Sequence, residues 1–437
     1  MESKKKVPTL NKVAYGIGTG GGCIFNQIAA AFLLNYYTDT VLIGAGAIAT
    51  MFLVCRIFDG VTDLVMGGIV DKTSSRLGKA RPWLIASAPL TLLGIVLLMN
   101  VPAGLGETGK LAYAYITYIF MNCIVYTIYG ISNTALLPLM THDKNESTML
   151  ATFSALGNNI IGLLAGSLIT PLVLNFGWKT SSVILGGAAC VLILISGLLN
   201  KEMESMEEGR QRASVPMSEQ LPATLKNRYF WLLLLLGAFS LIMNANAIGA
   251  QIFYCNMVLK NPMFMSVLMT AGQLPGIFIL FLMPAISKKW NKKTFLLMGA
   301  VLIIAGFAIT GLAGENTTMI AVGTVIRSLG VGPILSAVFA LVPDVVEYGN
   351  WKFGIRSEGL ISSAQSIGSK IGIGVGSALT GWILAAVGYN PVAEPTQAVI
   401  NAVKFDYTWM GVILGIIILV IVLLLDVEKY ADQYNRD

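Results

Sequence analysis

The chain has 437 residues, of which 55% are hydrophobic and 12% are charged, and its mean hydropathy is +0.73. Proteins on average contain about 25% charged residues, so this composition excludes a water-soluble globular protein. Long apolar runs, instead of alternating segments of about ten residues, exclude a transmembrane β-barrel and indicate an all-α polytopic membrane protein. The net charge of +6 follows from basic loops and requires no nucleic-acid partner.

The apolar runs predict twelve membrane-spanning helices, because a helix needs about 20 apolar residues to cross a bilayer. The predicted spans are 13–37, 42–69, 82–101, 111–137, 148–175, 181–199, 229–257, 262–286, 294–313, 317–343, 357–387 and 405–425. The first span is too long for a signal peptide and is predicted to be retained. A hydrophilic segment, 201–228, separates an N-terminal six-helix bundle (1–200) from a C-terminal one (229–437), which is typical of transporters built from two repeats.

The basic residues predict the orientation of these helices. Most of the Lys and Arg residues in the predicted loops lie on the side of the N-terminus. The positive-inside rule therefore places both termini and the central loop in the cytoplasm, with the helices in the lipid bilayer. The sequence carries no signal for an oligomeric state.

The second predicted span contains two acidic residues, Asp59 and Asp63, which are spaced to lie on one face of a helix. An ionised side chain within a bilayer is costly and usually marks an ion or substrate path. Thr62 adds a hydroxyl oxygen to the same face. Such oxygens can bind Na⁺, and a carboxylate in a low-dielectric site can bind a proton. The alternative is an ion-pair ladder with Arg56 that neutralises the helix.

The eleventh span contains Lys370, which is predicted to lie deep in the membrane and to need a counter-charge. Asp59 and Asp63 are the candidates across a central cavity. Gln365 and Ser366 lie on nearby turns and are expected to line that cavity. The alternative is that Lys370 extends to the surface or pairs with a backbone carbonyl.

Two cytoplasmic charge clusters are candidates for gating. The loop DKTSSRLGKARPW contains Asp71 and Arg76, and the corresponding part of the second half contains Asp344, Glu347 and Arg356. The alternative is that both clusters are solvated loops that determine topology.

No pattern in the sequence indicates enzyme chemistry. The five cysteines fall in predicted helices at irregular spacing and are expected to be free thiols. We find no metal-binding cluster, nucleophile–base pair or cofactor motif. The sequence therefore predicts a protein that is not an enzyme and has no cofactor or metal apart from a coupling ion at Asp59 and Asp63.

Several motifs resemble those of a known family. RIFDGVTDLVMGGIVDKTSSRLGKARPWL resembles the diagnostic stretch of the glycoside–pentoside–hexuronide:cation symporters, and NYYTDT, YTIYGISNTALLP and PDVVEYGNWKFGIRSEGLISSAQSIGSK are similar to further motifs of that family. The resemblance covers nearly the whole chain. It implies a major facilitator fold in a bacterial inner membrane and symport of a sugar or glycoside with Na⁺, H⁺ or Li⁺. Alternatives are an uncoupled facilitator, a carrier of a lipid-like or organic-anion solute, and a receptor that does not transport.

The resemblance also implies roles for individual residues. Asp59 and Asp63 match the family's cation-site carboxylates, and Thr127 matches a further cation ligand. Thr62 stands where the melibiose carrier has an asparagine, so the choice between Na⁺ and H⁺ stays open. The positions that line the sugar site of that carrier, or link it to the cation, are matched by Tyr126, Gln365, Ser366 and Lys370.

Other sugar-site positions depart from the melibiose carrier. Gly22 and Cys23 replace a sugar-binding Lys–Asp pair, and Gly130 replaces a second aspartate. Thr134 and Leu335 replace its tryptophans, and Ser154 its arginine. An α-galactoside is therefore disfavoured, and a glycoside that is anionic or carries an apolar aglycone is expected instead. Lys370 and Arg56 would receive an acidic group.

Overall fold

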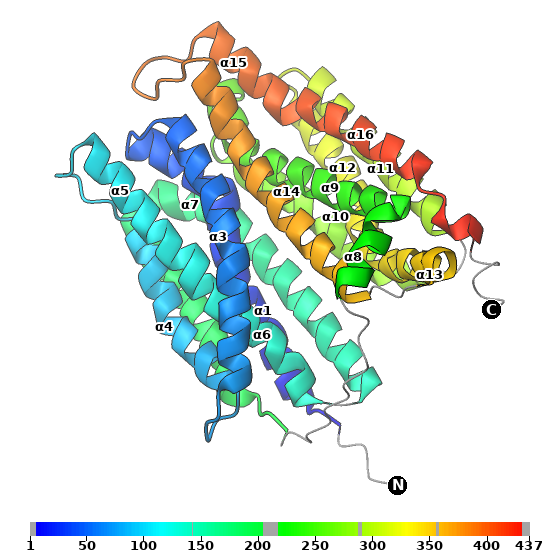
Figure 1. The fold of residues 1–437 in the computed structure, drawn as a ribbon. Helices are drawn as coiled ribbons and strands as arrows, with labels where there is room; N and C mark the ends of the chain where they lie inside the picture. Colours follow the sequence, from blue (N-terminus) through cyan, green and yellow to red (C-terminus); the bar gives the residue numbers. More distant parts are fainter. Residues whose placement is uncertain (1–5, 142, 204–216, 287–290, 355–357, 431–437) are drawn as a thin grey trace. The chain divides into compact units, whose positions relative to one another are not determined.

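The computed structural model describes residues 6–141, 143–203, 217–286, 291–354 and 358–430. Every regular element in these ranges is a helix (Figure 1). In the first half these are α1 (Thr9–Gln27), η1 (Ile28–Phe32), α2 (Leu33–Asn35), η2 (Tyr36–Thr40), α3 (Ala45–Lys72), α4 (Arg81–Leu98), α5 (Glu107–Tyr118), η3 (Ile119–Val125), α6 (Tyr126–Met140) and α7 (Lys144–Leu199).

The remaining helices follow the same all-α pattern. They are α8 (Met217–Lys226), α9 (Arg228–Phe253), η4 (Tyr254–Val258), α10 (Phe264–Ile286), α11 (Lys292–Leu312), α12 (Thr317–Ala340), α13 (Val342–Phe353), α14 (Glu358–Ala386), α15 (Gln397–Lys404), η5 (Phe405–Trp409), α16 (Met410–Leu424) and η6 (Val427–Tyr430). The chain turns within α7 at Gly177, whose φ of 72° favours glycine. This turn separates the two spans predicted at 148–175 and 181–199.

The chain forms two compact units. The first consists of Met1–Glu207, Asn261–Thr270 and Tyr389–Glu394, and the second of Glu208–Lys260, Ala271–Gly388 and Pro395–Asp437. Two hydrogen bonds join the short segments Asn261–Thr270 and Tyr389–Glu394 to the rest of the first unit. Ser167 and Thr270 share one at 2.9 Å, and the Tyr389 hydroxyl donates to Asp39 at 2.8 Å. The Tyr389 hydroxyl is protonated and can donate at neutral pH, and burial raises its pKa further above the ordinary value.

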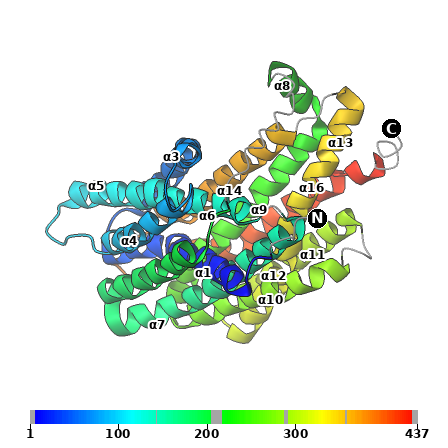
Figure 2. The same cartoon turned by 90° about the horizontal axis from the view of Figure 1, so that it is seen from below.

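In the first unit, α1 lies along α7, and the two helices are side by side in both ribbon views (Figures 1 and 2). Glycines permit this approach, because a Cβ atom at Gly16 or Gly157 would overlap the backbone of the other helix. Helix α4 packs on both α7 and α6, and α3 packs on α6 and η3. These contacts bring α3, which contains the predicted cation site, against α6.

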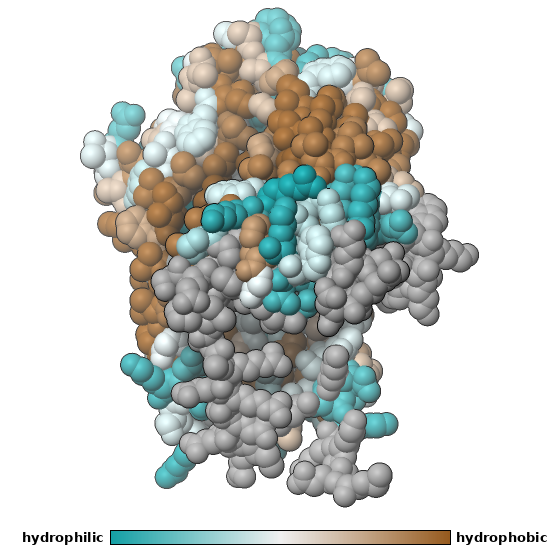
Figure 3. Space-filling view, turned by 45° about the vertical axis from the view of Figure 1, so that its right-hand side comes forward, coloured by the Kyte–Doolittle hydropathy of each residue, from teal (hydrophilic) through white to brown (hydrophobic). Residues whose placement is uncertain are grey.

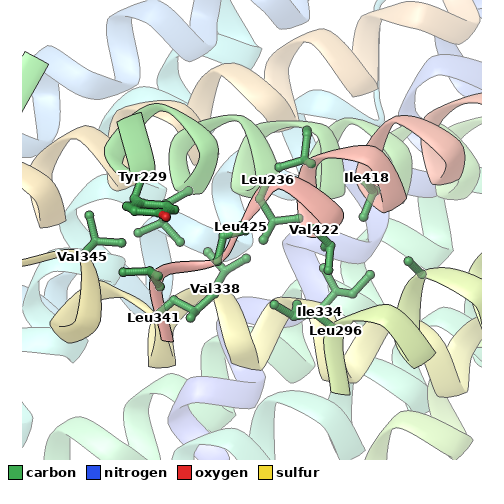
Figure 4. Packing of buried hydrophobic residues seen from close by; sticks show 14 of the residues in the cluster. Tyr229, Leu236, Leu296, Ile334, Val338, Leu341, Val345, Ile418, Val422 and Leu425 are labelled. Carbon is green, nitrogen blue, oxygen red and sulfur yellow. The ribbon is translucent and has the colours of Figure 1, made fainter. Parts of the chain in front are cut away.

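The second unit repeats this pattern with different residues. Helix α9 packs on α14, and α11 packs on α12 and α16. Its core gathers apolar side chains from α9, α11, α12, α13 and α16 (Figure 4). Tyr229, Leu296, Val338 and Ile418 are each at most 3% exposed there. At roughly 1.5–3 kcal/mol for each fully buried large apolar side chain, this cluster makes a large contribution to stability.

The surface also has the character expected of a membrane protein. Broad hydrophobic areas cover much of the face shown in Figure 3, and large apolar side chains such as Leu64 and Leu168 are more than half exposed. In the described part of the chain, nine helices are long and apolar enough to cross a membrane. The all-α fold predicted from the sequence is confirmed. The count of twelve spans, the cytoplasmic termini and the boundaries at 200 and 228 stay predictions.

Candidate cation and sugar site

Asp59 is the centre of a group of oxygen atoms contributed by α3 and α6. The residue as a whole is 7% exposed. Thr127, in α6, donates a hydrogen bond from Oγ1 to Oδ1 of Asp59 at 3.3 Å, and the hydroxyls of Thr62 and Thr127 lie 3.3 Å apart. The structure therefore brings together three of the four residues predicted to bind a cation. Asp63 lies one turn further along the same face of α3 and is half-buried.

Arg56 provides the positive charge nearest to this group in α3. Its Nη1 atom is 3.4 Å from Oδ2 of Asp59, and the two side chains are 14% and 9% exposed. The separation is long for a charge-assisted hydrogen bond. The guanidinium thus faces Asp59, and the predicted ion pair within α3 is present together with the oxygen group.

This group has the chemistry of a site for a small hard cation. Carboxylate and hydroxyl oxygens are the ligand types that suit such ions, and a cation beside Asp59 would compete with Arg56 for the carboxylate. A proton on Asp59 would also weaken the ion pair. Asp59, Asp63 and Arg56 together carry a formal charge of −1, which one bound Na⁺ or one proton would offset. An uncompensated charge at the centre of a bilayer costs roughly 2.5–3.5 kcal/mol.

Tyr126 begins α6 and is held by residues of α1. Its hydroxyl accepts a hydrogen bond from Nδ2 of Asn26 at 2.6 Å, and its ring packs against Phe25 and Tyr129 at centroid distances of 5.2 and 5.7 Å. The resemblance had indicated Tyr126 but not Asn26. The signal for Asn26 was an amide side chain within a long apolar run, which in a membrane helix needs a polar partner.

The glycine at position 22 is explained by Tyr129. A Cβ atom at Gly22 would overlap the Tyr129 ring, and the Tyr129 hydroxyl donates to the carbonyls of Gly18 and Thr19 at 3.0 Å each. The volume beside Gly22 is therefore filled from α6, and Cys23 beside it is buried. At Gly130, by contrast, a Cβ atom would meet nothing within 4 Å.

A second polar group joins α1, α6 and α7 and carries no charge. Thr19 accepts hydrogen bonds from Asn133 at 3.2 Å and from Ser154 at 3.0 Å. The Oδ1 atom of Asn133 is buried and has no hydrogen-bond partner among the described residues. Ser154, noted in the sequence as a replacement for an arginine, thus belongs to a neutral network of hydroxyl and amide groups.

The remaining predicted residues are more dispersed. Lys370 is half-buried in α14 of the second unit, and its pairing with an aspartate stays a prediction. Asp344 forms an ion pair with Lys292 at 2.6 Å, and Glu347 is half-buried in the same helix, α13. Asp71 and Arg76 are exposed at the end of α3 and in the loop that follows. The side chains of Gln365 and Ser366, and the whole of Arg356, lie outside the described residues.

Comparison with known proteins identifies the family of the chain. The family model for MFS/sugar transport proteins matches residues 14–429. The chain belongs to this family. Its members are membrane transporters, so the protein is a multi-pass transporter and not an enzyme, and the resemblance noted in the sequence is confirmed.

Individual relatives cover most of the chain. It is 28% identical to the isoprimeverose transporter of Lactiplantibacillus pentosus over 94% of this chain and 87% of that protein. It is 29% identical to the glucuronide carrier protein homolog of Escherichia coli (strain K12) over 90% of this chain and 87% of that protein. The crystal structure of the nucleoside transporter NupG superimposes with a TM-score of 0.63 at 14% identity, covering 95% of this chain and 99% of that one, which supports the fold alone.

Proposed function

We propose that this sugar transporter is a symporter, which couples entry of a glycoside to inward movement of Na⁺ or H⁺ by alternating access in the cytoplasmic membrane of a bacterium. The observation that carries the proposal is the contact of Asp59 with Thr127 and, through it, Thr62. These side chains come from two helices, so a cation held among them would affect how α3 packs on α6. That is the kind of contact through which an ion can bias a conformational equilibrium.

Competition for Asp59 supplies a physical basis for coupling. The carboxylate faces Arg56 of its own helix and accepts a hydrogen bond from Thr127 of α6. A cation would replace part of the contact with Arg56 and be held by oxygen atoms of both helices. If the form with bound cation also binds the glycoside more tightly, linkage requires that the glycoside tighten cation binding by the same factor.

Uptake into proteoliposomes tests the coupling. Isoprimeverose and a methyl glucuronide serve as probes, with an inward Na⁺ or H⁺ gradient and with the gradient collapsed by an ionophore. We expect accumulation only with a gradient, and its loss in Asp59→Asn. Glu107→Gln is the control, because it removes an acidic charge from an exposed position in the first turn of α5.

Two outcomes would contradict the proposal. Accumulation in Asp59→Asn equal to that of the unaltered protein would remove the cation site. Uptake that equilibrates but never accumulates, with or without a gradient, would identify an uncoupled facilitator, which is the alternative function on this fold.

For the substrate, the site favours a neutral glycoside over an acidic one. Arg56 faces Asp59, and the polar group of Thr19, Asn133 and Ser154 is uncharged. Neutral hydroxyl and amide groups suit sugar hydroxyls, whereas a carboxylate would need a cationic partner such as Lys370. Isoprimeverose should therefore compete for uptake better than the glucuronide. The reverse order would assign Lys370 or Arg56 to an acidic substrate.

A further inference from the structure

Two glutamates have the same structural role in the two halves of the chain. Glu202 follows the end of α7, and its carboxylate accepts hydrogen bonds from the backbone N–H groups of Lys79, Ala80 and Arg81 at 2.7, 2.9 and 2.9 Å. Glu428 follows the end of α16, and its carboxylate accepts from the N–H groups of Lys292 and Lys293, both at 3.1 Å. In each half, an acid after the last long helix thus binds the start of α4 or of α11.

The first turn of each helix needs such a partner. The first N–H groups of an α-helix have no acceptor within the helix, and the end carries partial positive charge. The residues at the capping positions, Ala80 for α4 and Asn291 for α11, make no side-chain capping hydrogen bond. The glutamates supply this function from 122 residues away in the first half, measured to Ala80, and from 136 residues away in the second, measured to Lys292.

A basic side chain completes the contact in the opposite direction. Arg81, at the start of α4, donates to the carbonyls of Gly197 and Leu198 near the end of α7, at 3.0 and 3.3 Å. Lys293, at the start of α11, donates to the carbonyl of Leu423 near the end of α16 at 2.8 Å. The last carbonyls of a helix likewise lack donor partners within the helix, and this end carries partial negative charge. In each helix pair, an acidic side chain therefore caps the start of one helix, and a basic side chain caps the end of the other.

Each exchange is supported by its surroundings. A Cβ atom at Gly78 would overlap the Glu202 carboxylate, and the φ of 107° at this residue favours glycine. The backbone N–H of Met203 also donates to the carbonyl of Leu139 at 2.7 Å. In the second half, Asp426 forms ion pairs with Lys293 and Lys429. The local sequences differ, but the same two helix ends are joined.

We propose that Glu202 with Arg81, and Glu428 with Lys293, are equivalent clasps, one in each half, that make the two joined helix ends move as a single piece during transport. Without a clasp, the two helix ends would lose these polar contacts and could slide against each other. The first clasp also fixes the loop that contains Arg76, one of the residues predicted to act in gating. The inference depends on transport by this family but not on the cation site, so the two can fail separately.

Hydrogen exchange on the full-length protein in lipid nanodiscs tests this role. In Glu202→Gln we expect exchange at least about fivefold faster at residues 79–81, as for loss of a helix cap, and also at residues 197–200 of the joined helix, with residues 292–293 unchanged. In Glu428→Gln the increase should appear at residues 292–293 and 422–425, with residues 79–81 unchanged. Glu107→Gln, which removes an exposed acid from the first turn of α5, should change none of these segments.

Two results would overturn the proposal. An increase confined to residues 79–81 in Glu202→Gln would identify a simple cap that does not join the helices. An increase of similar size in both halves would identify general loss of stability. Arg81→Gln provides a second test if Glu202→Gln does not fold, because it removes the other arm of the clasp and should also expose residues 79–81 and 197–200 to exchange.

Discussion

The two halves of the chain share their helix packing and differ in the charge of their second long helix. Reciprocal caps join the ends of α4 and α7 in the first half and of α11 and α16 in the second. However, α3 contains Arg56, Asp59 and Asp63 in its interior, whereas the interior of α10 has the sequence FMSVLMTAGQLPGIFILFLMPAI, with no charged residue. The repeated features are those that packing requires. The charged residues inside α3 are not repeated in α10, and they are the residues expected to bind the ion.

Buried charge in the second half has a different environment. Asp406 accepts a hydrogen bond from Asn246 at 3.0 Å. Arg327 lies over the Phe307 ring at 4.8 Å and the Tyr407 ring at 5.7 Å. An amide and aromatic rings thus surround these groups, and such contacts stabilise a buried charge without binding an ion. The proposed cation site is therefore the one in the first half.

The largest effect is expected from replacing Asp63, one of the charged residues that α3 contains and α10 lacks. Asp63→Cys should reduce gradient-driven accumulation by roughly 5- to 150-fold, the range of a typical coupling free energy. Uptake into proteoliposomes measures it. Val65→Cys, on the exposed face of the same helix, should accumulate normally. Equal accumulation by the two variants would mean that the second acid is not needed for coupling.

The next largest effect is expected from removing Lys370, the basic residue that the second half is predicted to contribute to the substrate site. Lys370→Ala should weaken glycoside binding by about tenfold or more if its ammonium group binds the substrate or an aspartate. Calorimetric titration of the purified protein with isoprimeverose measures this change. Unchanged affinity together with normal uptake would assign Lys370 a purely structural role.

A smaller effect is expected when the Asn26–Tyr126 contact is removed. Tyr126→Phe should weaken binding of isoprimeverose roughly fivefold, because the hydroxyl is lost and the Asn26 amide loses its acceptor. Tyr113→Phe is the control, since it removes a tyrosine hydroxyl that donates to Leu97 elsewhere in the first unit. Identical affinities for the two variants would mean that the Tyr126 hydroxyl has no role in sugar binding.

The smallest effect concerns two glycines of the first half that both replace charged residues of the melibiose carrier. Gly22→Ala should lower the free energy of unfolding by about 1–3 kcal/mol, because its Cβ overlaps the Tyr129 ring. Gly130→Ala should change it by no more than about 0.5 kcal/mol, because the space is open. Thermal unfolding of the purified variants measures the difference. Equal melting temperatures would contradict the fit of Tyr129 against α1.

The all-α membrane fold and the acidic residues of the candidate site could be predicted from the sequence. Apolar runs of span length require helices in a membrane, and Asp59 and Asp63 stand out because an acid is costly there. Thr127 could be indicated only by resemblance, because its contact with Asp59 joins residues 68 positions apart. Tyr129 beside Gly22 and the clasp of Glu202 with α4 could not be predicted, because they depend on how helices that are distant in the sequence pack together.

The most direct test of the account is the effect of a cation on glycoside binding in the purified protein. The dissociation constant of isoprimeverose is measured by calorimetry with Na⁺ varied at fixed pH and with pH varied at fixed Na⁺, for the unaltered protein and for Asp59→Asn. The account predicts that one of the two cations tightens binding at least about fivefold in the unaltered protein and has no effect in the variant. Cation dependence that persists undiminished in Asp59→Asn would contradict it.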